Sequence, residues 1–146
     1  MFKHILLATD GSAASEHAAQ IAADMARIHG ATLTVLYVVD PYPYLGIGET
    51  NPLGFQSYMA SAHKQAAQAH AKVADLCRQG DKPVTLQARI SEDVTASVGI
   101  VETARNEGAD LIIMGSHGRT GLVRLMLGSV AAKVLAESPV PVLIVR

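Results

Sequence analysis

Three glycines and a serine stand where an apolar run of the sequence gives way to a helix-like pattern. Gly115 ends the run "DLIIMG", Gly118 follows three residues later, and Gly128 and Ser129 open the segment "GSVAAKVLAES". The N-terminus of a helix carries unpaired N–H groups and about half a positive charge, which suit an anion. Glycine lacks a Cβ, so its amide can approach an anion closely and can adopt positive φ. These residues are therefore predicted to hold the phosphates of a ligand, with the Ser129 hydroxyl as an additional donor.

The alternative explanation is that these glycines only form turns and allow close packing. The segment is not a Walker A loop, because the chain contains no Gly-Lys-Ser or Gly-Lys-Thr. It is not a dinucleotide-binding G-x-G-x-x-G either, since that motif follows the first strand, where this chain has "ATDGS". The position of the glycines after an apolar strand and before a helix favours phosphate binding.

Strand-like and helix-like segments alternate along the whole chain. Apolar runs predict strands at residues 4–9, 32–39, 82–90, 109–115 and 139–146. Helical periodicity predicts helices within residues 10–30, 56–80, 93–108 and 127–138, and residues 40–55 are predicted to form a loop. Because the strands are apolar at nearly every position, both faces of each strand are expected to be buried. The sequence therefore predicts a doubly wound, five-stranded parallel sheet with helices on both faces, a Rossmann-like α/β/α sandwich.

The turn after the first strand is the second place where a ligand is expected. In a doubly wound sheet, ligands bind beyond the carboxyl ends of the strands, where the strand order reverses. Asp10 ends the first strand at such a position, and we expect it to contact the ligand. The alternative is that Asp10 caps the first helix, for which Ser12 is a candidate N-cap and Gly30 a candidate C-cap.

The chain resembles the universal stress protein family over its whole length. The segment "DLIIMGSHGRTGLVRLMLGSVAAKVLAESPVPVLIVR" is similar to the family's C-terminal signature and contains the pattern G-x2-G-x9-G-[S/T] of its ATP-binding branch. The segment "HILLATDGSAASEHAAQIA" is similar to the family's first strand and helix. The resemblance implies that the ligand is ATP, and any Mg²⁺ would be held largely by its phosphates.

The resemblance also implies a set of nucleotide contacts at the ends of three strands and at the start of the last helix: Ala8, Asp10, Val38, Met114, Gly115, His117, Gly118, Gly128, Ser129 and Val130. The glycines and Ser129 would hold the phosphates, supported by the Val130 amide. Met114 and His117 would border the nucleotide, although an exposed loop histidine is an alternative role for His117. Ala8 and Asp10 would lie beside the adenosine, and the main chain of Val38 would read the adenine edge.

Composition and charge exclude several classes of partner. The chain has 146 residues, 49% of them hydrophobic, and is predicted to form one domain, residues 1–146. Twelve basic and thirteen acidic residues leave a net charge of −1, which argues against binding to nucleic acid or a membrane surface. No stretch reaches the roughly 18 apolar residues of a membrane helix, and no secretory signal is evident, so a cytoplasmic protein is expected. The single cysteine, Cys77, cannot form an internal disulfide and is expected to be a buried thiol.

The last strand, from Val140 to Arg146, is expected at an edge of the sheet. An apolar edge strand exposes unpaired N–H and C=O groups, and pairing with the same strand of a second chain covers them. The resemblance also implies dimerisation through this strand. A homodimer is therefore expected.

No pattern of catalytic residues accompanies the phosphate-binding segment. The sequence has no Ser/His/Asp order with a nucleophile elbow, no paired-carboxylate motif and no Walker lysine. We therefore predict an ATP-binding regulatory protein of stress adaptation that hydrolyses ATP slowly or not at all, with a protein partner that the sequence does not identify. A nucleotide-independent scaffold that dimerises is the alternative.

Overall fold

Strands and helices alternate in the computed structural model of the chain, which describes residues 1–39, 52–92, 94–117 and 126–146. In chain order the elements are β1 (His4–Thr9), α1 (Ala13–His29), β2 (Thr32–Val38), α2 (Pro52–Arg78), β3 (Leu86–Ser91), α3 (Ala96–Glu107), β4 (Leu111–Gly115), α4 (Ser129–Glu137) and β5 (Val142–Val145). Four of the five strands fall within the segments that the apolar runs predict, and β3 extends one residue beyond its segment, to Ser91. No helix in the described part of the chain is long and apolar enough to cross a membrane.

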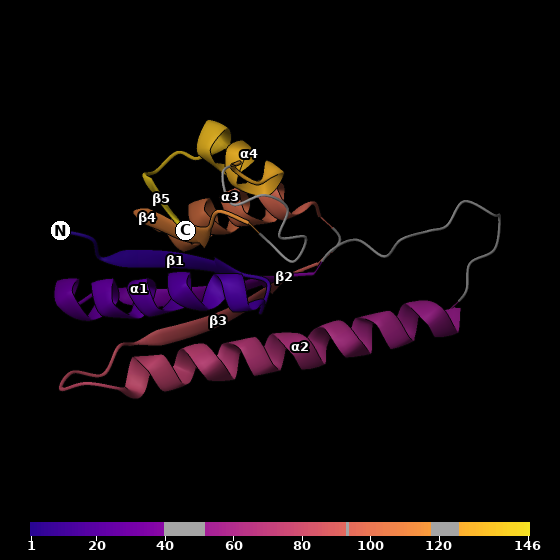
Figure 1. Cartoon of the computed structure of the whole chain (residues 1–146), viewed down its shortest axis with the longest axis horizontal. Coiled ribbons are helices and arrows are strands. Elements are labelled where there is room, and N and C mark those ends of the chain that lie inside the picture. Colours follow the sequence, from indigo (N-terminus) through magenta and orange to yellow (C-terminus); the bar gives the residue numbers. More distant parts are fainter. Residues whose placement is uncertain (40–51, 93, 118–125) are drawn as a thin grey trace.

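The five strands form one parallel sheet in the order β3-β2-β1-β4-β5. The chain starts at the central strand β1, proceeds to β3 at one edge, and then returns to build β4 and β5 on the other side. Helices α1 and α2 cover one face of the sheet, and α3 and α4 cover the other (Figure 1). The predicted doubly wound fold is confirmed, and its strand order reverses between β1 and β4.

Each face of the sheet buries its own group of side chains. On β1, Ile5 and Leu7 pack with α1 and α2, whereas Leu6 and Ala8 pack with α3 and α4. Ile5, Leu6 and Leu7 have no exposed surface, and burying a large aliphatic side chain contributes about 1.5–3 kcal/mol. α1 contributes mainly buried alanines to this packing, so the helix can lie close to the sheet. The firmly packed centre of the sheet therefore fixes the positions of the turns at its carboxyl end.

Helix ends differ from the sequence prediction at two places. α2 begins at Pro52, four residues before the predicted start at residue 56. Proline is well suited to the first position of a helix, because its missing N–H would have no partner there. The rest of the predicted loop, residues 40–51, lies outside the described residues. Ser12 occupies the N-cap position of α1, but its hydroxyl makes no capping hydrogen bond, whereas Gly30 ends α1 in the predicted left-handed conformation with φ 65°.

The cysteine of α2 is buried, as the sequence predicts. Cys77 is 3% exposed and has no disulfide partner among the described residues. Burial raises the pKa of its thiol, and the positive charges of Arg27 and Arg78 lower the pKa to a smaller extent. The thiol is therefore mostly protonated at neutral pH and serves the packing of α2 on the sheet.

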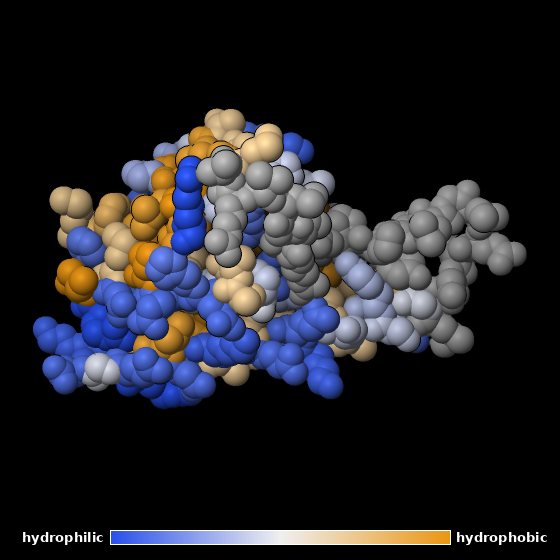
Figure 2. All heavy atoms as spheres, in the orientation of Figure 1, coloured by the Kyte–Doolittle hydropathy of each residue, from blue (hydrophilic) through white to orange (hydrophobic). Residues whose placement is uncertain are grey.

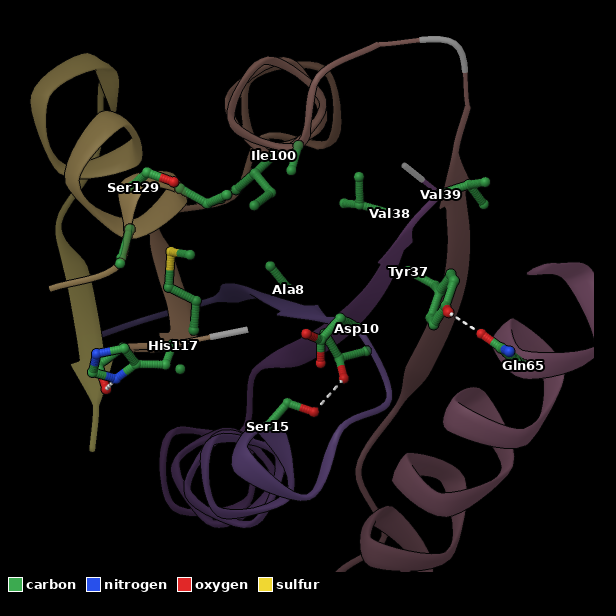
Figure 3. A pocket seen from close by; sticks show the side chains of 18 of the residues that line it. Ala8, Asp10, Ser15, Tyr37, Val38, Val39, Gln65, Ile100, His117 and Ser129 are labelled. Atoms are coloured by element: carbon green, nitrogen blue, oxygen red, sulfur yellow. Dashed lines mark hydrogen bonds between the residues drawn. The ribbon is translucent and has the colours of Figure 1, made fainter. Parts of the chain in front are cut away.

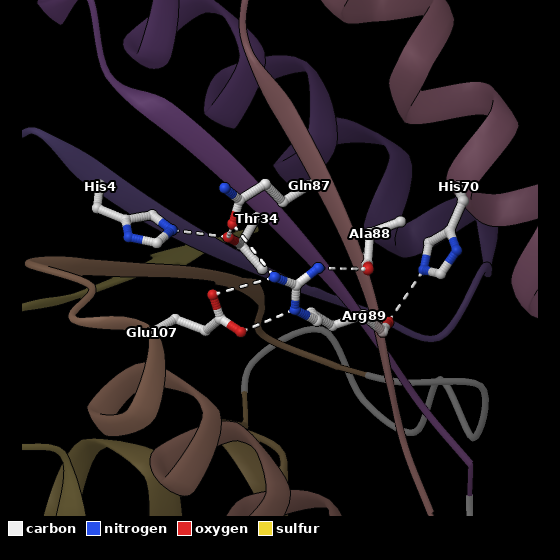
Figure 4. A network of polar contacts seen from close by, with 7 residues as sticks. All are labelled: His4, Thr34, His70, Gln87, Ala88, Arg89 and Glu107. Atoms are coloured by element: carbon white, nitrogen blue, oxygen red, sulfur yellow. Dashed lines mark hydrogen bonds and ion pairs between the residues drawn. The ribbon is translucent and has the colours of Figure 1, made fainter.

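A polar network joins β1, β2 and β3 to α3 and reaches α2 through His70 (Figure 4). His4 Nε2 lies 2.7 Å from the hydroxyl of Thr34, a side chain with no exposed surface. The Arg89 side chain donates from Nε to the Glu107 carboxylate at 2.7 Å. The Arg89 carbonyl oxygen lies 3.1 Å from His70 Nε2. Burial lowers the pKa of His70, and its hydrogen bond to Arg89 opposes that change. The Thr34 hydroxyl is therefore buried and hydrogen-bonded, and it lies outside the cavity at the carboxyl ends of the strands.

Candidate functional site

A cavity of about 550 Å³ opens at the carboxyl ends of β1, β2 and β4, where the strand order reverses. Its walls come from the turns that follow β1 and β4, from one side of α2, and from the first turns of α3 and α4. Figure 3 shows Asp10 near its centre, between Ser129 and His117 on one side and Tyr37 and Gln65 on the other. The cavity therefore lies where the doubly wound topology places a ligand.

Nine of the predicted nucleotide contacts line this one cavity: Ala8, Asp10, Val38, Met114, Gly115, His117, Gly128, Ser129 and Val130. Gly118 lies outside the described residues. The fold thus brings together residues from β1, β2, β4 and α4 that are far apart in the sequence. Their contact with a nucleotide stays a prediction.

Gly128 packs the start of α4 against the end of β4. Its N–H donates to the Ser116 carbonyl at 2.8 Å, and a Cβ on Gly128 would lie 2.8 Å from that same oxygen. The Ser116 N–H in turn donates to the Val145 carbonyl of β5 at 2.9 Å. The amide of Gly128 is therefore already bonded, and this glycine is required for close packing.

Neither of the two glycines that the structure describes here uses the positive φ that glycine permits. Gly128 has φ −62° as the N-cap of α4, and Gly115 is likewise outside the left-handed region. A Cβ on Gly115 would make only ordinary contacts, the nearest at 3.5 Å from the His117 carbonyl. The conformation at both positions is available to any residue, so what glycine provides here is space.

Three amides at the start of α4 remain unpaired beside the cavity. The first N–H of this helix to find an intrahelical partner is that of Ala132, which donates to the Gly128 carbonyl at 2.9 Å. The N–H groups of Ser129, Val130 and Ala131 make no hydrogen bond to the residues that the structure describes, and all three residues line the cavity. The N-cap residue of α4 is Gly128, which has no side chain with which to cap these amides. This arrangement concentrates the positive end of the helix dipole on the cavity and suits an anionic group.

Asp10 combines a local turn with a position at the cavity. Its Oδ1 accepts a hydrogen bond from the Ser12 N–H at 2.9 Å. Ser12 is itself the N-cap residue of α1, so Asp10 stabilises the turn before the helix and does not cap the first turn of the helix. The carboxylate is thereby held at the mouth of β1, where it lines the cavity.

The sequence did not predict that α2 forms one wall of the cavity. This wall contains Tyr58, Ser61 and Gln65, and the Tyr37 hydroxyl donates to Gln65 Oε1 at 3.2 Å. Tyr37 precedes Val38 on β2 and therefore faces the opposite side of the sheet, toward α2. That alternation predicts a tyrosine beside the second helix, but the distance between this helix and the cavity depends on tertiary packing.

The cavity contains few charges. Among its described lining residues, Asp10 is the only carboxylate, and no lysine or arginine is present. The His117 ring points away from the centre of the cavity in Figure 3, with Nδ1 3.0 Å from the Ser116 hydroxyl. Its Nε2 is buried and has no hydrogen-bond partner among the residues that the structure describes. The described residues contain no group of three side chains that could hold a metal ion.

An open parallel sheet with a cavity at its reversal point and an unpaired helix N-terminus beside it defines a Rossmann-like α/β protein. The profile of the universal stress protein family matches residues 1–146, and the chain belongs to this family. It is 38% identical over 148 residues to a universal stress protein of Thermus aquaticus, with 100% of both chains covered.

Solved structures of the same family share the fold. Universal stress protein UspA from Lactobacillus plantarum superimposes with a TM-score of 0.74 at 26% identity, covering 99% of this chain and 97% of that one. The universal stress protein from Archaeoglobus fulgidus in complex with dAMP gives a TM-score of 0.69 at 18% identity, covering 99% and 98%.

Proposed function

We propose that the cavity binds an adenine nucleotide, ATP with any Mg²⁺ carried on its phosphates, and that the protein is a nucleotide-binding regulator of stress adaptation in the cytoplasm. The observation that carries this proposal concerns the amides of Ser129, Val130 and Ala131, three residues that line a cavity of about 550 Å³. These amides have no hydrogen-bond partner among the residues that the structure describes. That volume is within the range of roughly 300–1,000 Å³ typical of small-molecule sites. A family relative of the same fold in complex with dAMP is consistent with this choice of ligand.

The proposed orientation follows from the polarity of the walls. The phosphates lie at the start of α4, where Gly115 leaves space and the free amides donate. The base lies in the apolar part of the cavity between Val38 and Ile100, close to the main chain of β2. Asp10 then meets the nucleoside, because its carboxylate lies between these two ends (Figure 3).

Slow hydrolysis or none is part of this proposal. Phosphoryl transfer to water requires a group that positions the water and a cation that stabilises the transition state. The only carboxylate among the described lining residues is Asp10, which sits at the nucleoside end in the proposed orientation and already accepts from Ser12. The site therefore favours retention of the nucleotide over its turnover.

The direct test is the mass of any small molecule released when protein purified without added nucleotide is denatured. We expect an adenine nucleotide. Calorimetry with ATP, ADP and AMP in the presence of Mg²⁺ should then give saturable heat with a micromolar or lower Kd. If calorimetry finds neither heat nor saturation with adenine nucleotides, the proposal fails, and the alternative of a nucleotide-independent scaffold is favoured.

We also propose a homodimer formed through residues 140–146. β5 lies at an edge of the sheet, and hydrophobic side chains gather over it in Figure 2. The Pro141 carbonyl accepts a bond from β4, and the Val145 carbonyl accepts one from Ser116, which directly follows β4. The main-chain groups of Val142 and Ile144 therefore point outward in the alternating pattern of a parallel strand. An apolar edge of this kind is stabilised by pairing with a second copy.

Light scattering is expected to give twice the 15.3 kDa mass of one chain at micromolar concentration. The outward amides of Val142 and Ile144 should be protected from hydrogen exchange, because in the proposed dimer the second chain accepts their hydrogen bonds. A monomer with rapid exchange at both amides would contradict the dimer and leave the nucleotide proposal unaffected.

A further inference from the structure

A chain of buried hydroxyl groups lies directly beneath Asp10. The Gly11 N–H donates to Thr9 Oγ1 at 3.1 Å, Thr9 Oγ1 lies 2.9 Å from Ser15 Oγ, and Ser15 Oγ donates to the Ser12 carbonyl at 2.7 Å. The Thr9 and Ser15 side chains belong to residues that are only 7% and 6% exposed, and the bond between them appears in Figure 3. The chain therefore links the end of β1 to the first turn of α1.

The direction of these hydrogen bonds follows from the number of protons. A hydroxyl group has one hydrogen, and that of Ser15 is used on the Ser12 carbonyl, which can only accept. Thr9 must therefore donate to Ser15, while its oxygen accepts from the Gly11 N–H. Both hydroxyl hydrogens are committed within the protein, so neither is available to donate to a ligand.

This chain fixes the turn that carries Asp10. Gly11 adopts φ +76°, and its N–H donates to Thr9 Oγ1. The Ser12 carbonyl accepts from the Ser15 hydroxyl, and the Ser12 N–H donates to Asp10 Oδ1. Gly11 and Ser12 are thus each bonded to a buried hydroxyl group, and Asp10 is linked to these hydroxyl groups through Ser12. A carboxylate held in this way loses little conformational freedom when it meets a ligand, which favours binding.

We propose that Thr9 and Ser15 are positioning residues that hold the Asp10 carboxylate against the nucleoside part of the ligand. This inference rests on the proposed nucleotide site. It adds two residues that line the same cavity but act through Asp10, because their hydroxyl hydrogens are used within the protein. It predicts that loss of either hydroxyl weakens nucleotide binding even though neither hydroxyl can donate to the nucleotide.

Thr9→Val keeps the shape of the side chain and removes the central hydroxyl of the chain. We expect its Kd for ATP, measured by calorimetry, to rise about fivefold, the equivalent of one ordinary hydrogen bond. Ser15→Ala should act in the same direction and provides a second variant if Thr9→Val folds poorly.

The matched control is Thr34→Val, on the neighbouring strand β2. Thr34 has no exposed surface, and its hydroxyl is hydrogen-bonded to His4 at 2.7 Å, but it does not line the cavity (Figure 4). Thr34→Val should lower the melting temperature as a buried hydroxyl loss does, and leave the Kd for ATP unchanged. A general loosening of the sheet would instead weaken binding in both threonine variants.

A double-mutant cycle with Asp10→Ala separates positioning from a merely structural role. With Asp10 removed, Thr9→Val has no carboxylate to position and should change the Kd no further. If the two substitutions weaken binding by factors that multiply, or if Thr9→Val binds ATP as tightly as the wild type, the positioning role is overturned and the nucleotide site stands. If the wild-type protein binds no adenine nucleotide, both proposals are overturned.

Discussion

Ser129→Asp is expected to weaken ATP binding by roughly 30- to 100-fold without loss of stability. Ser129 is the first residue of α4 and lines the cavity. A carboxylate there interacts favourably with the helix dipole, by about 0.3–1 kcal/mol, so the empty protein should melt at the same temperature or slightly higher. The same carboxylate repels the phosphates of the proposed ligand, and two like charges about 4 Å apart cost roughly 1–4 kcal/mol. The melting temperature of the empty protein should therefore stay the same or rise slightly, while the affinity for ATP measured by calorimetry should fall.

Ser129→Asn is the matched control, because asparagine has the size of aspartate without its charge. It should weaken ATP binding far less than Ser129→Asp. Equal effects of the two substitutions would mean that the start of α4 is not close to the phosphates, and would remove the main support for the proposed orientation.

Gly128→Ala is expected to lower the free energy of unfolding by about 1–3 kcal/mol, the usual cost of an added methyl group that does not fit. Its Cβ would lie 2.8 Å from the Ser116 carbonyl, closer than folded proteins tolerate, so α4 must move away from β4. That movement also lengthens the hydrogen bond from the Gly128 N–H to the same carbonyl. Urea denaturation of the protein without nucleotide measures the effect.

Gly115→Ala is the control for Gly128→Ala, because it adds the same methyl group at a position that has room for it. A Cβ at this position would have no neighbour nearer than 3.5 Å, so the same substitution should cost less than about 1 kcal/mol. Equal losses at the two glycines would contradict the packing role of Gly128. Because Gly128→Ala disturbs the fold, Ser129 is the better position at which to test phosphate binding.

The sheet could be predicted from sequence because its strands are buried on both faces. Runs such as residues 4–9 are apolar at successive positions, and the structure shows why: Leu6 packs with α3 and α4, while Ile5 and Leu7 pack with α1 and α2. Alternation of such runs with helical patterns leaves a doubly wound sheet as the natural arrangement. The location of the cavity follows from that topology, which is why Asp10 and Ser129 could be placed together although 119 positions separate them in the sequence.

What the sequence left unpredicted depends on distances between elements. Gly128 was interpreted as an open amide for an anion, but its amide is bonded because the end of β4 lies within 2.8 Å. Ser12 has the right type and place for an N-cap, yet the bonds made by Asp10 and Ser15 organise this turn instead. Pro52 fell within the predicted loop of residues 40–55, whereas it begins α2. No periodicity in the chain contains this information.

Ser116 connects the proposed nucleotide site to the proposed subunit contact. Its N–H bonds the Val145 carbonyl of β5, and its own carbonyl bonds the Gly128 N–H at the start of α4. Only two hydrogen bonds therefore separate the helix end that would meet the phosphates from the strand that would meet a second chain. In the proposed dimer, these two bonds would form a short path along which a shift in the first turn of α4 on nucleotide binding would reach the rim where two protomers would join.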